Sequence, residues 1–369
     1  LSRDLPDVLH LRMADPGSLS GALVARELSI ATVFTMAPDP HVHVQARERS
    51  GYLERPDFAQ ADAREALWLR MNLVEHFAAQ AREVVLFPRP NLRQDLEELV
   101  GVDVAAGPPR HTIVAEGIDA ELADTAGRIV ASGSRPPVLE DLDAAIARLP
   151  ADRHGLPLMI SVGRMHEVKG MARLVAAFAT DKELSARANL VIVGGELDSP
   201  SPAEAAELER IELALRDRPH MRDRIALLGR RSNDDVALLL SAAHAGWGSR
   251  IGANGAYACG SRKEEFGLAI IEAMAAGLPV LAPMAGGPAS YVQTGLTGVL
   301  VDTGSVAAIA AGMHRALDLA GDPGTASLTM RMVRERFTLE RMAQTLAALY
   351  RISTAASTLA LPINEDSAA

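Results

Sequence analysis

Short apolar runs alternate with helix-length segments along most of the chain, and this alternation limits the fold more than any other feature. Runs that are apolar throughout are typical of strands buried on both faces, as in a parallel sheet covered by helices on both sides. The sequence therefore predicts an α/β protein with parallel sheets. The expected strands lie in residues 7–13, 31–41, 83–88, 111–119, 156–165, 189–196, 224–229, 245–249, 279–284 and 298–302.

The length of 369 residues fits two domains of roughly 150–200 residues each. Residues 121–154 are rich in Pro, Gly and Ser and predict a linker with a short helix. We expect a first domain over 1–120, a second over 155–335, a helix over 336–352 that returns to the first domain, and a tail over 353–369. A long helix is also expected over 61–81, and a helix over 17–28 with Ser18 or Ser20 as its cap.

Charge and cysteine content exclude several classes of protein. The net charge is −10 and no run of Lys and Arg is present, which argues against a nucleic-acid partner. No stretch of 18 apolar residues predicts a membrane span. The single cysteine, Cys259, excludes a disulfide framework and a cysteine-based zinc site, and it fits a cytoplasmic location.

Basic residues follow the expected strand at 156–165. Gly163 ends this strand, and Arg164 and Lys169 come directly after it. Ligands of open parallel sheets bind beyond the carboxyl ends of the strands, and a glycine there lets the backbone approach them closely. Two cations suit a diphosphate, whose charge as a leaving group needs stabilisation. The alternative is that both are solvated residues of a loop.

The stretch "SRKEEFGLAIIEAMAAGLPV" at 261–280 is a second candidate. The amides of Phe266, Gly267 and Leu268 can reach a phosphate at the start of a helix, where the dipole favours anions. Glu272, one turn into that helix, can accept hydrogen bonds from a ribose, and Glu264 can reach sugar hydroxyls. An ordinary helix with acidic residues near its start would have the same sequence pattern, so this alternative is equally consistent with it.

Together these motifs resemble a known family. "GRMHEVKG", "EEFGLAIIEAMAAGLPV", "GGPASYVQTGLTGVLVD" and "RERFTLERMAQTLAALY" follow one another as in retaining nucleotide-sugar glycosyltransferases of the family-4 type. The resemblance covers about 156–350 strongly and 7–119 weakly, and "ACGSRKEEFG" is similar to the sucrose-phosphate-synthase-like branch. It implies the GT-B fold, with two Rossmann-like domains facing across a cleft and the N-terminal one incomplete at its start.

The resemblance also implies an activity and a set of roles. The protein is expected to move a hexose from a nucleotide-diphosphate sugar, UDP-glucose being favoured, to a small-molecule or glycan acceptor, with no metal and no cofactor. Arg164 and Lys169 would neutralise the diphosphate, Glu264 would contact the transferred sugar and Glu272 would hold the ribose. The backbone at Arg230 and Arg231 would contact the base, and the 266–268 amides the phosphate.

The N-terminal half departs from the family. The usual first strand and glycine-rich loop are not found, so a missing segment or a partner chain would complete the domain. Ala37 stands where the family has a histidine, and His41 or His43 can replace it in catalysis, unless both are surface residues. Further candidates for the acceptor side, each with an ordinary loop role as the alternative, are His10, Asp15 and Arg89.

Two other functions remain open at this point. A phosphorylase, or a nucleotide-sugar hydrolase or epimerase, can use the same scaffold. A non-catalytic or partner-dependent subunit that binds a nucleotide would also explain the missing strand and Ala37.

Overall fold

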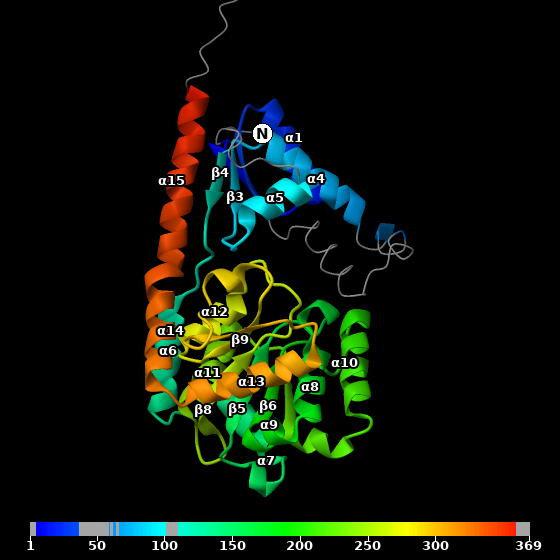
Figure 1. Ribbon diagram of the computed structural model, residues 1–369. Helices are drawn as coiled ribbons and strands as arrows, with labels where there is room; N and C mark the ends of the chain where they lie inside the picture. Colours follow the sequence, from blue (N-terminus) through cyan, green and yellow to red (C-terminus); the bar gives the residue numbers. More distant parts are fainter. Residues whose placement is uncertain (1–4, 37–58, 60–61, 64–65, 101–109, 359–369) are drawn as a thin grey trace, which may run out of the picture. The chain divides into compact units, whose positions relative to one another are not determined.

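The computed structural model describes residues 5–36, 59, 62–63, 66–100 and 110–358 (Figure 1). The chain divides into two compact units. Unit 1 comprises residues 1–115 and 340–369, and unit 2 comprises residues 116–339. Among these described residues each unit contains one sheet, and every strand pairing within both sheets is parallel.

Unit 1 has a four-stranded sheet in the order β1-β2-β3-β4. Its strands are β1 (Val8–Leu11), β2 (Ala31–Thr35), β3 (Glu83–Leu86) and β4 (Arg110–Ile113). Between and after them lie α1 (Pro16–Glu27), α4 (Leu67–Gln80), α5 (Leu92–Val100) and the long α15 (Leu339–Thr358).

Helices cover both faces of the unit 1 sheet. On one face, side chains of α4 and α5 such as Phe77 and Leu96 form a core with strand residues such as Phe34. On the other face, Leu349 of α15 packs against Val33 of β2 and the neighbouring strands. Burial on both faces explains why these strands read as continuous apolar runs.

Unit 2 has a six-stranded sheet in the order β10-β9-β8-β5-β6-β7. The strands are β5 (Pro157–Val162), β6 (Asn189–Val193), β7 (Ile225–Gly229), β8 (Gly252–Ala258), β9 (Val280–Pro283) and β10 (Gly298–Val301). The chain adds β6 and β7 on one side of β5, then returns to add β8 on the other side. The sheet therefore has a topological switch point between β5 and β8, which is where ligands of such sheets bind.

Helices also cover both faces of this sheet (Figure 1). One core is shared by α8 (Met171–Thr180), α10 (Pro202–Leu215) and α13 (Val306–Ala320). The helices α7 (Pro137–Ala147), α11 (Asn233–Ala245) and α12 (Leu268–Ala275) contact the sheet as well, and α6 (Ala120–Ala131) packs on α11. The remaining helical segments are η2 (Ala151–Arg153), η3 (Glu167–Lys169), α9 (Lys182–Arg187), η4 (Pro219–Arg224), η5 (Gly287–Ser290) and α14 (Pro323–Arg336).

Residues 121–154, expected to be a linker, contain helices α6 and α7 and lie within unit 2. The reason is apolar burial: Leu139, Leu142 and Ile146 of α7 have no exposed surface. The prolines that suggested a linker precede or begin helical segments, and Gly127 is accommodated inside α6.

Three other local predictions are wrong. Residues 246–249 are not a strand but follow the end of α11, and the strand is β8, a few residues later. Helix α4 begins at Leu67, because Ala66 has a left-handed backbone with φ of 48°. Neither serine caps α1; the carboxylate of Asp15 accepts the amide of Ser18 at 2.7 Å.

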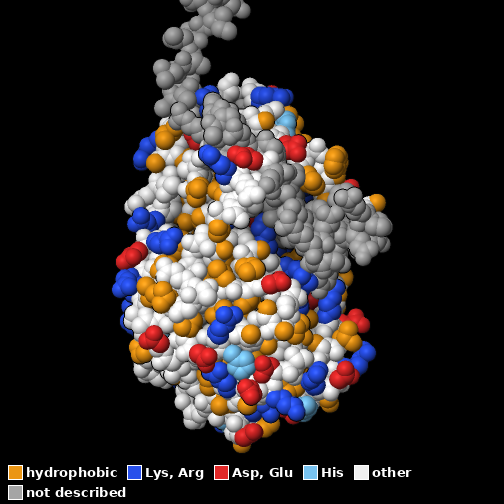
Figure 2. Space-filling model, viewed as in Figure 1, with side chains coloured by type: hydrophobic (Ala, Val, Ile, Leu, Met, Phe, Trp, Pro, Cys, Tyr) orange, Lys and Arg blue, Asp and Glu red, His pale blue; other side chains and the backbone are white. Residues whose placement is uncertain are grey.

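Charged side chains of both signs are interspersed on the face shown in Figure 2. Within the described part of the chain, no helix combines the length and the apolar character needed to cross a membrane.

Candidate active site

Arg164 and Lys169 follow strand β5 and therefore lie at the switch point of the unit 2 sheet. Gly163 follows the last residue of this strand and donates its amide to Val193 of β6 at 3.0 Å. The Arg164 side chain is exposed, and its guanidinium forms no hydrogen bond or ion pair with the described residues. Lys169 lies at the end of η3, just before α8. Arg164 is therefore available to an anion outside the protein.

Lys169 and Glu264 meet across the switch point, 95 residues apart in sequence. Their Nζ and Oε1 atoms are 2.5 Å apart, and the side chains are only 27% and 14% exposed. Lys169 follows β5 and Glu264 follows β8, the two strands that flank the switch point. The structure thus brings together two of the residues that the sequence proposed for one site.

The backbone of the loop that carries Glu264 is fixed by a second loop after β9. The carbonyl of Glu264 accepts the amide of Gly287 at 2.9 Å. Gly286 has φ of 93°, and a Cβ there would lie 2.0 Å from the Glu264 carbonyl oxygen. Because a Cβ would clash there, glycine is required at position 286 for the close approach of the two loops. Lys263 and Glu265, on either side of Glu264, also form an ion pair of 2.6 Å.

Helix α12 begins directly after this loop. Gly267, with φ of 92°, precedes the helix, and no side chain caps its first amides. Phe266 is buried against Tyr291, whose hydroxyl donates to the Phe266 carbonyl at 2.6 Å. Leu268 is 40% exposed. The uncapped amides at this helix start are suited to an anion.

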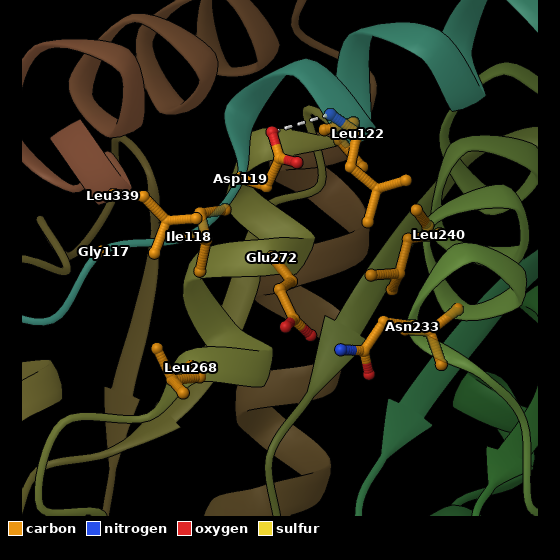
Figure 3. Close-up of a pocket in the computed structure, with 13 residues that line it drawn as sticks. Gly117, Ile118, Asp119, Leu122, Asn233, Leu240, Leu268, Glu272 and Leu339 are labelled. Carbon is orange, nitrogen blue, oxygen red and sulfur yellow. Dashed lines mark hydrogen bonds between the residues drawn. The ribbon is translucent and has the colours of Figure 1, made fainter.

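Glu272 lies one turn further along α12, in a pocket of about 260 Å³ (Figure 3). Its carboxylate extends toward the side-chain amide of Asn233 at the start of α11. No described residue donates a hydrogen bond to it. Burial raises the pKa of Glu272. The pocket is lined by Gly117, Ile118, Asp119, Leu122, Ala123, Asn233, Val236, Ala237, Leu240, Leu268, Glu272, Ala276 and Leu339.

This pocket is suited to a molecule with an apolar ring and adjacent hydroxyl groups. Its walls are mostly apolar, and its polar groups gather at Glu272, Asn233 and Asp119. Asp119 already caps α6 by accepting the amides of Glu121 and Leu122. The carboxylate of Glu272 accepts no hydrogen bond from the described residues, so both of its oxygens can accept hydrogen bonds from a diol.

Arg230 and Arg231 lie next to this site, but their side chains do not line the pocket. Arg230 is 80% exposed and lies 3.7 Å from Glu196, and Arg231 binds Asp141 of α7 at 2.8 Å. The predicted backbone contact with a base remains a prediction.

The candidates for the acceptor side belong to unit 1. Both ring nitrogens of His10 form hydrogen bonds: Nε2 with the hydroxyl of Thr35 at 2.6 Å, and Nδ1 with the hydroxyl of Tyr350 at 2.7 Å. Burial, and then the charge of Arg12, lower the pKa of His10 to about 4. Asp15 caps α1, and Arg89 lies in the turn between β3 and α5. His41 and His43, and also Ala37, lie outside the described residues.

Three polar residues at the site were not predicted. Ser261 donates to Glu264 Oε1 at 2.5 Å, and Asn233 and Asp119 line the pocket. The position of Asn233 after "GRRS" marks a helix start, which was a usable signal. Among the described residues, no group of three or more His, Cys, Asp and Glu side chains is placed to hold a metal ion.

Known proteins share sequence with this chain. Residues 150–327 match the family model "Glycosyl transferases group 1". The sucrose synthase of Acidithiobacillus caldus is 31% identical over 268 residues, which are 68% of this chain and 32% of that protein. The sucrose synthase of Nitrosomonas europaea is 33% identical over 42% of this chain and 19% of its own length. The chain thus spans a third or less of these curated relatives.

Solved structures show the fold. The sucrose-phosphate synthase of Thermosynechococcus elongatus aligns over 95% of this chain and 74% of its own, with a TM-score of 0.67 and 24% identity. An Anabaena protein in complex with UDP-glucose aligns over 93% of this chain and 79% of its own, with a TM-score of 0.62 and 19% identity. The two parallel α/β units are those of GT-B glycosyltransferases, as the sequence predicted.

Proposed function

Because residues 150–327 form a glycosyl transferases group 1 domain, we propose that the protein transfers a hexose from a nucleotide-diphosphate sugar to an acceptor hydroxyl. The observation that carries this proposal is the grouping of Lys169, Glu264 and the start of α12 at one switch point, with Glu272 one turn away. UDP-glucose is the favoured donor, because the relatives include sucrose synthases and an Anabaena protein that was solved with UDP-glucose.

Each group at the site has a role in this proposal. Glu272 accepts hydrogen bonds from the ribose, and the apolar walls of its pocket contact the nucleoside. Arg164, Lys169 and the uncapped amides of α12 hold the diphosphate. Glu264 accepts a hydroxyl of the hexose. The chemistry of the diphosphate thus rests on cations and amides of the chain, and we propose that no metal is required.

The transfer proceeds with retention of configuration. The bond from the sugar C1 to the diphosphate oxygen breaks, and the bond from C1 to the acceptor oxygen forms on the same face. The acceptor proton passes to the departing phosphate oxygen. Arg164 and Lys169 stabilise the negative charge that develops there, which is the largest contribution that such a site offers to the rate.

The acceptor is a small molecule or a glycan that binds mainly to unit 1, and the protein acts in the cytoplasm. The two compact units meet at 115–116 and 339–340 in the sequence, and in this proposal unit 2 holds the donor and unit 1 the acceptor.

A direct test incubates the protein with UDP-, GDP- and ADP-glucose and a panel of sugar and sugar-phosphate acceptors, and follows nucleoside diphosphate release. The proposal expects release from one donor that depends on an acceptor, with a product of retained anomeric configuration by NMR. Release without an acceptor identifies a hydrolase, and binding without release from any donor identifies a nucleotide-binding subunit. Either result refutes the proposal.

A further inference from the structure

The carboxylate of Glu264 is held at one of its two oxygens. Oε1 lies 2.5 Å from Lys169 Nζ and 2.5 Å from Ser261 Oγ, and the Cys259 thiol is a distant third neighbour at 3.8 Å. No described residue donates a hydrogen bond to Oε2. The carboxylate is therefore anchored on one side and leaves one oxygen for a ligand.

Ser261 is itself held by a hydrogen bond from a residue in the loop that follows another strand. Its carbonyl accepts the hydroxyl of Thr303 at 2.8 Å, and the two residues are only 1% and 2% exposed. Ser261 follows β8, which lies inside the sheet. Thr303 follows β10, which is the edge strand two positions away from β8. A chain of hydrogen bonds thus runs from the buried Thr303 through the buried Ser261 to the partly exposed Glu264.

We propose that Ser261 and Thr303 are positioning residues that aim Oε2 of Glu264 at a hydroxyl of the hexose. This inference rests on the proposed function of the site. When Lys169 binds the diphosphate, its hold on Oε1 weakens, and Ser261 is then the donor that keeps the carboxylate in place. A hydrogen bond to a charged, partly buried group is among the stronger ones, so its loss has a measurable effect.

The test compares Ser261→Ala, Thr303→Val and Thr303→Ser with the wild type. Ser261→Ala removes the donor to Glu264, and we expect kcat to fall by about tenfold or more. Thr303→Val keeps the shape but removes the hydroxyl, and we expect a fall of about three- to tenfold. Thr303→Ser retains the hydroxyl and is expected to restore most of the activity. The matched control is Thr329→Val, since Thr329 is also fully buried and donates to a backbone carbonyl at 2.9 Å, but in α14.

A second readout separates positioning from stability and does not depend on turnover. Calorimetry measures the affinities for UDP and for UDP-glucose. The variants should bind UDP within about twofold of the wild type and lose affinity only for UDP-glucose, because Glu264 contacts the sugar and not the nucleotide. Equal losses for both ligands, or unchanged affinity for UDP-glucose in Ser261→Ala, would overturn the inference. If the wild type itself binds UDP-glucose but transfers nothing, the proposed function fails while this comparison still decides the role of Ser261.

Discussion

At the scale of single residues, Glu272 has an unfavourable environment in the free protein. Burial raises its pKa, and no described residue compensates its charge. The ionised form therefore destabilises the fold at neutral pH. This cost shrinks as the pH falls below the raised folded-state pKa and is gone below the pKa of the unfolded chain. Residues that retain such a cost are frequent in functional sites, which agrees with the proposed role of Glu272 toward a ribose.

Glu272→Gln should raise the melting temperature near pH 7 and at the same time weaken nucleoside diphosphate binding by about tenfold. In the wild type, affinity should also fall as the pH is lowered through the raised pKa, because the protonated acid accepts hydrogen bonds less well. The variant should lack this fall. Calorimetry over a pH series measures both effects, with Glu209→Gln on the exposed face of α10 as the control. Equal affinities for the variant and the wild type would remove Glu272 from the site.

At the scale of elements, the start of α12 depends on the backbone of Gly267. Its φ is 92°, and a Cβ there would lie 2.9 Å from Ile270 Cδ1 and 3.0 Å from Tyr291 Oη. A residue other than glycine is strained in this conformation and also crowds its neighbours. The same residue thus sets both the geometry of the loop and the access to the helix amides.

Gly267→Ala should lower the free energy of unfolding by about 1–2 kcal/mol and weaken diphosphate binding. Gly127→Ala is the matched control, because Gly127 lies inside α6 and a Cβ there meets nothing within 4 Å. That change should stabilise the protein by up to about 1 kcal/mol, since alanine favours a helix more than glycine does. Urea denaturation distinguishes the two. A Gly267→Ala protein as stable as the wild type would contradict the strained backbone described above.

The sequence predicted strands with strong apolar character, such as β6, but missed β8 (Gly252–Ala258). β8 lies in the middle of the sheet and is built mainly from Gly and Ala, because other chain segments approach it closely. A Cβ on Gly255 would lie 2.5 Å from the Ala243 carbonyl and 2.6 Å from the Leu158 carbonyl. Crowding of this kind selects small residues, and residue-by-residue strand propensities do not register it.

At the scale of the whole molecule, residues distant in sequence complete unit 1. Tyr350 of α15 hydrogen-bonds to His10 of β1, 340 positions away, and Leu349 completes the core on that face of the sheet. His10 is neutral in the fold because its pKa is lowered to about 4, compared with 6.5 for the free side chain. Protonation therefore favours the unfolded chain, so the stability of unit 1 should fall as the pH drops from 6.5 toward 4.

Tyr350→Phe should cost about 0.5–1.5 kcal/mol of unfolding free energy, the usual net value of one hydrogen bond. His10→Gln should remove the part of the acid destabilisation that lies between pH 6.5 and 4. Denaturation at several pH values tests both variants, with the exposed His220→Gln as the control. If acid destabilises His10→Gln as steeply as the wild type, then His10 is not the group that titrates.

The sequence could propose Arg164, Lys169, Glu264 and Glu272 as donor-site candidates because they follow strand ends or a helix start within ordered motifs. The structure confirms that Lys169 and Glu264 lie together at the switch point, whereas their roles toward a donor remain proposals. Ser261 and Thr303 could not be found, because they act through a contact between loops 42 residues apart that only the packing of the sheet creates. His10 was assigned to the acceptor side because a strand end faces a ligand in such folds, but both its nitrogens are engaged within unit 1.

The role of Lys169 in catalysis is tested most directly by the turnover of Lys169→Ala with UDP-glucose and the best acceptor, measured beside Lys182→Ala as a control outside the site. Loss of one preorganised charge at a leaving group commonly lowers kcat by about 10²–10³-fold. We predict a fall of that size for Lys169→Ala at an unchanged fold, judged by circular dichroism, and normal turnover for Lys182→Ala. A folded Lys169→Ala protein with kcat within about twofold of the wild type would contradict the proposed role of Lys169 in stabilising the leaving group.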